Sequence, residues 1–198
     1  MEHFASTDHQ WTAEVASAAF SGDDFSKRDD ASSILSKIAA KNPDAVMAVI
    51  GEALLDPKRR WRWQIGSNRD VFSSLPAQVV MDWITKTGVE GARRVARHLS
   101  SPTMAEDGTL IVPELTKRVL VAYGDDDQVF REFVVGRHDM EASWGLVSAH
   151  HEEHARVARA FLNHALPVIR RWAERELAGA EESAKFWRKH EEDEGWDS

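Results

Sequence analysis

Cysteine is absent from this sequence. Without a thiol the chain has no disulfide framework and no cysteine-based active site, and a cytoplasmic location is the simplest expectation. No apolar run approaches the roughly 18 residues of a membrane-spanning helix. Residues 1–10 also lack the basic start and apolar core of a signal peptide. We therefore expect no membrane partner.

Several patterns of common enzymes are missing as well. The chain contains no GxxxxGK[ST] phosphate-binding loop, no GxSxG nucleophile elbow and no Rossmann glycine pattern. Its aspartate runs at 23–24, 29–30 and 125–127 lack the spacing, central glycine and closing glutamate of an EF-hand, so helix capping explains them better. These absences favour a protein that is not an enzyme and needs no cofactor.

Positive charge is in short supply. Lysine and arginine number 25 against 33 aspartates and glutamates, which leaves a net charge of −8 over 198 residues. Proteins dedicated to duplex DNA are usually basic. The negative net charge favours a protein partner over nucleic acid. A basic toxin or nuclease would be a suitable partner for this acidic chain. Hydrophobic residues make up 42% of the chain, enough for a core.

The strongest positive pattern covers residues 143–187. Apolar side chains recur there at steps of three and four, which places them on one face of a helix. Pro167 interrupts the pattern, because its ring clashes with the preceding turn and it has no amide hydrogen. The sequence therefore predicts two antiparallel helices. The stripe of the second comprises Ile169, Trp172, Ala173, Leu177, Ala180, Ala184 and Trp187.

Shorter helical pairs are predicted upstream, at residues 34–54, 76–99 and 113–136. Pro43 and Pro113 suit helix starts, Gly88 suits a helix end, and residues 125–127 suit a helix cap. The long loop 100–112 ends in a short extended piece at 110–112. We expect one domain over residues 1–198, with a first helix and linker (1–30), about four hairpins (31–190) and a frayed acidic tail (191–198).

The predicted fold class is all-α. Hairpins recurring every 30–45 residues or so are typical of two-helix solenoid units. Such a unit cannot bury its apolar face alone, so neighbours stack. An α-solenoid of stacked antiparallel hairpins is the expected architecture, and a compact helical bundle is the alternative.

Residues 166–173 (LPVIRRWA) resemble the second helix of a HEAT-type repeat, with related sequences at 42–50 (NPDAVMAVI) and 88–96 (GVEGARRVA). Residues 112–187 are similar to helical-repeat tails of larger bacterial sensor and defence proteins, on the strength of VPELTKRVL, YGDDDQVF and REFVVGRHD. The resemblance implies a scaffold or recognition surface. It brings no catalytic residues, and the NTPase parts of those larger proteins have no counterpart here.

Two basic groups are candidate binding residues. The connector KRRWRW supplies Arg59, Arg60, Trp61, Arg62 and Trp63, and the helix near residue 95 supplies Arg93, Arg94 and Arg97. Guanidinium groups on phosphates and indoles on bases would hold nucleic acid. The alternative is that the tryptophans pack between hairpins and the cations pair with acids.

A further pair, Arg170 and Arg171, lies beside Trp172 and would suit an acidic partner. Solvated or salt-bridged arginines are the plainer interpretation of this pair.

The segment HHEEH is the one candidate for metal chemistry. His150, Glu153 and His154 match the H-x-x-E-H pattern of inverted zincins. The two histidines would bind zinc, Glu153 would activate a water molecule, and Glu174 or Glu176 would complete the ligands. The plainer alternative is a solvated helix face. A zinc-dependent hydrolase therefore stands as the third hypothesis, after protein binding and nucleic-acid binding.

Overall fold

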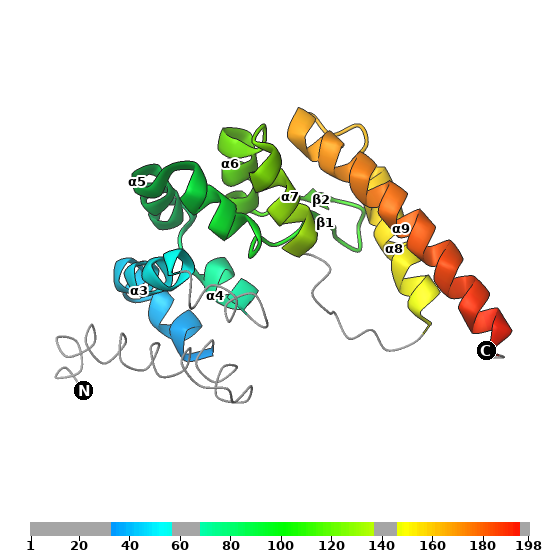
Figure 1. Ribbon diagram of the computed structural model, residues 1–198, viewed down its shortest axis with the longest axis horizontal. Helices are drawn as coiled ribbons and strands as arrows, with labels where there is room; N and C mark the ends of the chain where they lie inside the picture. Colours follow the sequence, from blue (N-terminus) through cyan, green and yellow to red (C-terminus); the bar gives the residue numbers. More distant parts are fainter. Residues whose placement is uncertain (1–32, 57–67, 137–145, 195–198) are drawn as a thin grey trace. The chain divides into compact units, whose positions relative to one another are not determined.

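The computed structural model describes residues 33–56, 68–136 and 146–194 (Figure 1). The chain is predominantly helical, with one short pair of strands among the described residues, which confirms the all-α class. In this described part, no helix is both long enough and apolar enough to cross a membrane. The predicted N-terminal helix and the linker that follows it (1–30) lie outside the described residues.

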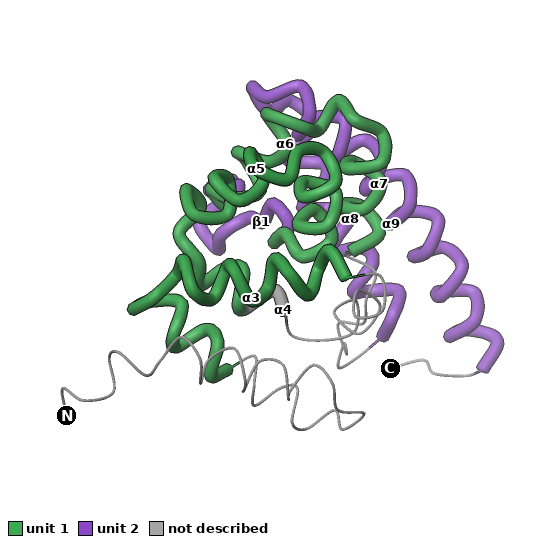
Figure 2. The backbone as a smooth tube through the Cα atoms, turned by 60° about the vertical axis from the view of Figure 1, so that its left-hand side comes forward, with its two compact units in different colours: residues 1–100, 113–139 green, residues 101–112, 140–198 purple. Residues whose placement is uncertain are grey.

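The chain divides into two compact units (Figure 2). Unit 1 comprises Met1–Ser100 and Pro113–Asp139, and unit 2 comprises Ser101–Val112 and Met140–Ser198. Each unit has buried apolar side chains of its own. The expectation of a single domain stays a prediction.

The described part of unit 1 begins with a helix at 33–39. The helices that follow are α3 (Pro43–Leu55), α4 (Asn68–Ser74), α5 (Ala77–Ala96), α6 (Glu114–Tyr123) and α7 (Asp127–Val135). Pro43 is the first residue of α3, as predicted. Gly88 interrupts α5 with a φ of 68°, a conformation that favours glycine.

The predicted cap of α7 is also present. The Asp126 carboxylate accepts hydrogen bonds from the backbone amides of Gln128 at 2.9 Å and Val129 at 3.0 Å. These amides have no partner inside the helix, so the carboxylate satisfies donors that would otherwise need water.

Helix α5 is the packing centre of unit 1, because α3, α6 and α7 all pack against it. Its approach to α3 depends on Gly51, where a Cβ atom would collide with the indole of Trp83. Gly136, just after α7, likewise lies against the Arg97 carbonyl of α5. Glycine at these two positions allows the helices to pack closely.

Unit 2 contains β1 (Thr103–Met104), β2 (Leu110–Ile111), α8 (Val147–Ala160) and α9 (Pro167–Asp193). The strands are antiparallel, with Thr103 opposite Ile111 and Met104 opposite Leu110. Helices α8 and α9 pack along each other as a hairpin (Figure 1). Pro167 is the first residue of α9, so both the break and the two helices agree with the sequence pattern.

The core of the hairpin combines small and large side chains. Alanines line both helices, and Phe161 meets the fully buried Trp172 edge to face, with ring centroids 5.6 Å apart. Small residues let the helix axes approach, while the aromatic pair fills the space near the turn. The buried alanines are Ala155, Ala158, Ala173, Ala180 and Ala184.

The N-terminus of α8 is capped by the far end of α9. Leu146, the N-cap residue, offers no side-chain acceptor. Instead the buried Glu191 carboxylate accepts hydrogen bonds from the Ser148 amide at 3.0 Å and from the Ser148 hydroxyl. The Ser148 hydroxyl and amide hold the pKa of Glu191 below its usual value. A carboxylate here also compensates the positive end of the helix dipole.

Candidate functional site

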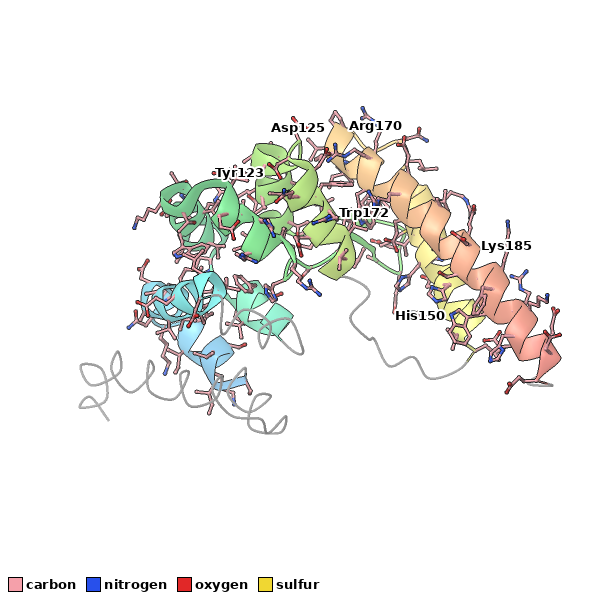
Figure 3. The ribbon with its side chains drawn as sticks, in the orientation of Figure 1. Tyr123, Asp125, His150, Arg170, Trp172 and Lys185 are labelled. Atoms are coloured by element: carbon pink, nitrogen blue, oxygen red, sulfur yellow. The ribbon has the colours of Figure 1, made fainter. Side chains whose placement is uncertain are left out.

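Three histidines gather on α8. The ring centroids of His150 and His154 lie 4.2 Å apart, and His151 lies 5.9 Å and 6.5 Å from them. All three are half-buried, and His150 is labelled in Figure 3. Their proximity follows from the spacing, since residues four apart share one face of a helix.

Of the carboxylates in the zincin hypothesis, Glu176 lies beside the histidine cluster as proposed, whereas Glu153 is engaged elsewhere. Glu176 of α9 is buried, and its Oε1 lies 3.7 Å from Nδ1 of His154. Glu153, the expected base, is exposed and accepts a 2.6 Å hydrogen bond from Nε of Arg156. The Arg156 hydrogen bonds also lower the pKa of Glu153. The carboxylate of Glu153, the proposed general base, is thus already bound by Arg156.

Across the described ranges 33–56, 68–136 and 146–194, no group of three or more histidine or acidic side chains could hold a metal ion. Glu174, the other proposed third ligand, is exposed on α9. The zinc hypothesis stays a prediction.

The arginines of α5 are engaged within unit 1. Their side chains are only 27%, 16% and 21% exposed, in sequence order. Each pairs with a side chain of α5 or α7: Arg93 with Gln128 at 2.8 Å, Arg94 with Glu90, and Arg97 with Glu132 at 3.4 Å. Two of the three therefore tie α5 to α7.

The connector residues Arg59, Arg60, Trp61, Arg62 and Trp63 lie outside the described residues. Their proposed contribution to a nucleic-acid surface stays a prediction.

Arg170 closes the turn between α8 and α9 (Figure 3). Its guanidinium donates to the backbone carbonyls of His164 at 2.7 Å and Ala165 at 3.1 Å. Arg171, its neighbour, is half-buried. The Arg170 side chain is therefore bound to its own turn, which weakens the case for its binding an acidic partner.

One surface was not anticipated from the sequence: the side of α9 turned away from α8, here called the outward face. It comprises Ala178, Glu182, Lys185, Phe186 and Lys189, all exposed. Phe186 is 65% exposed, more than any other large hydrophobic side chain among the described residues. Figure 3 shows Lys185 projecting from the helix.

Phe186 is held in place despite its exposure. Its ring meets the half-buried Trp187 edge to face, with centroids 5.5 Å apart, and Trp187 meets His190 in the same way at 5.6 Å. Phe186 lies two residues after the buried Ala184, off the apolar stripe. Its position off the stripe is the sequence feature that could have indicated its exposure.

The charges on α9 differ between its two sides. Beside α8 they pair across the hairpin: Glu181 with Arg159 at 2.7 Å, and Arg188 with Glu152. On the outward face, Glu182, Lys185 and Lys189 make no ion pair with any residue that the structure describes. The outward face therefore keeps charges that are available to a partner.

Unit 1 also has an open cavity of about 260 Å³ between α4, the start of α5, residues 98–100 after α5, and the start of α6. Buried His98 stacks on Phe72 at its wall, with centroids 5.3 Å apart, and Thr116 donates to the Ser100 carbonyl at 2.6 Å. None of the residues predicted to bind or catalyse lines this cavity.

No protein-family model matches the chain, and searches of curated proteins and of solved structures found no match either. The HEAT-like resemblance accordingly stays a prediction.

Proposed function

We propose that this protein is a non-enzymatic interaction module that binds a protein partner through the outward face of α9. One observation carries the proposal: Phe186, a large aromatic side chain, is 65% exposed on a long and otherwise well-packed helix. Exposed aromatic side chains lose unfavourable contact with water when a partner covers them.

The surroundings of Phe186 have the composition of a binding surface. Aromatic side chains are enriched at the centres of interfaces, and polar side chains surround them. Glu182, Lys185 and Lys189 would provide that polar rim. The helix has 27 residues, hence a length of about 40 Å, and offers a long surface.

We also propose that the helices belong to a HEAT-like solenoid. The support is local: in the segment LPVIRRWA, Ile169, Trp172 and Ala173 are fully buried against the hairpin partner, as the second helix of such a repeat would require. A solenoid would use its stacked surface for recognition, which agrees with an interaction role.

Nucleic-acid binding is less well supported. Of its candidate residues, Arg93, Arg94 and Arg97 are largely covered and paired with side chains of unit 1. A phosphate backbone would have to compete with these pairs. We therefore favour protein over nucleic acid as the partner.

The proposal is tested by affinity capture with three versions of the full chain: the wild type, Phe186→Ala and Val121→Ala. Val121 is a matched control, because it is 59% exposed but lies on α6 of unit 1. We expect wild type and Val121→Ala to retain the same proteins and Phe186→Ala to lose them. Retention that is identical for all three, or absent from all three, would contradict the proposal.

A further inference from the structure

We infer that the outward face of α9 binds a second copy of this chain, as an antiparallel helix pair with a two-fold axis between Lys185 and Phe186. The inference rests on the proposed function, because it names the partner of the same surface. It is carried by the exposed Phe186 together with Glu182 and Lys189, which have opposite charges and flank the axis at equal distances.

The spacing of the two charges makes the face self-complementary. Glu182 and Lys189 are seven residues apart, about two helical turns or 10.5 Å, so they lie on nearly the same line along the helix. Their midpoint falls between residues 185 and 186. A two-fold axis there sets Glu182 of one copy opposite Lys189 of the other, and the reverse. A parallel pair in register would instead set like charges together.

The same axis provides a contact for the aromatic ring. The two-fold axis keeps each side chain on its own side of the interface, so Phe186 of one copy meets Phe186 of the other, and two phenyl rings attract in an offset or edge-to-face arrangement. Ala178, two turns before Lys185, is small enough to let the helices approach. The exposed ring, the lysine and the two ion pairs thus fall on one continuous surface.

No existing ion pair within the described residues has to break for this pairing. The charges of α9 that border α8 are already paired with Arg159 and Glu152, whereas those of the outward face are not. Exposed ion pairs contribute little individually, and one helix pair buries less than the roughly 1,600 Å² of a standard interface. We therefore expect a reversible dimer whose population rises with concentration.

Sedimentation equilibrium of the full chain over a concentration series at low salt tests the inference. We expect the wild type to move from monomer to dimer. Glu182→Lys or Lys189→Glu should each weaken association about tenfold, because two pairs are replaced by like charges. An equimolar mixture should recover the dimer, since the first variant has lysine at both positions and the second has glutamate at both.

Two further variants, each replacing an exposed hydrophobic side chain by alanine, complete the experiment. Phe186→Ala should weaken association, whereas the control Val121→Ala, on the other unit, should leave it unchanged. A wild type that is monomeric at every concentration would overturn the inference. So would a mixture that associates no better than its components. Single variants that associate as well as the wild type would also overturn it, because only the antiparallel register turns two attractive pairs into like-charge pairs in each variant.

The outcomes also separate this inference from the proposed function. If the chain is monomeric but still retains another protein in a Phe186-dependent manner, the second-copy inference fails and the proposed function stands. If neither self-association nor capture depends on Phe186, both fail.

Discussion

Replacing Phe161 by alanine should cost unit 2 much of its stability, whereas the same replacement at Phe186 should cost almost nothing. Both phenylalanines belong to the α8–α9 hairpin, but Phe161 is 0% exposed and Phe186 is 65% exposed. Comparing the two variants therefore isolates the effect of burial on stability, because the residue type and the unit are the same.

The expected magnitude follows from the packing of Phe161. Fully burying such a side chain contributes about 1.5–3 kcal/mol to the free energy of unfolding. The cavity left behind, and the lost edge contact with Trp172, raise the cost of Phe161→Ala to about 3–5 kcal/mol. A typical domain is stable by only about 5–15 kcal/mol. For Phe186→Ala we expect a change within about 0.5 kcal/mol.

Urea unfolding followed by far-UV circular dichroism measures both variants. With a urea dependence of about 2 kcal/mol per molar, the midpoint should fall by roughly 1.5–2.5 M for Phe161→Ala. Because two compact units can unfold separately, hydrogen exchange of the α8 and α9 amides should accompany the curve. Equal losses for the two variants would refute the reasoning, since they would mean that Phe186 is buried in solution.

Other predictions concern single contacts. Since Glu191 has a lowered pKa, its contribution to stability is fully present above its usual pKa of 4.5 and is lost as the pH falls through the lower folded value; thermal melts should show Glu191→Gln to be less sensitive to acid than the wild type. Gly51→Ala should destabilise by about 1–3 kcal/mol, because the new methyl group meets the Trp83 indole. Gly179→Ala should instead stabilise by about 0.5–1 kcal/mol, since nothing lies within 4 Å of its Cβ position, and urea curves of both variants test the contrast. Asp126→Ala should cost about 1 kcal/mol in the same assay through loss of the α7 cap.

Local signals made much of the fold predictable. The period of the apolar residues and the break at Pro167 predicted α8 and α9, and Pro43, Gly88 and residues 125–127 predicted helix ends. Each of these effects acts within a few residues, through a missing donor, a positive φ or a capping carboxylate. Such effects can be read from the sequence without knowing which helices pack together.

Contacts between helices were not predictable in the same way. The pairing of Arg97 with Glu132 depends on how α7 packs against α5, and neither helix alone specifies it. The spacing of His150 and His154 did predict their proximity, but not that Arg156 would bind Glu153. The exposure of Phe186, by contrast, did have a signal in the sequence, because Phe186 lies off the apolar stripe that packs against α8.

The cap that Glu191 provides for α8 has a consequence for the order in which the hairpin forms during synthesis. Ser148 and Glu191 are 43 residues apart, so the start of α8 leaves the ribosome well before its capping carboxylate does. Until then, the first turn of α8 must direct its amides to water. The nascent hairpin would therefore fold from its turn near Phe161 outward and complete its open end last.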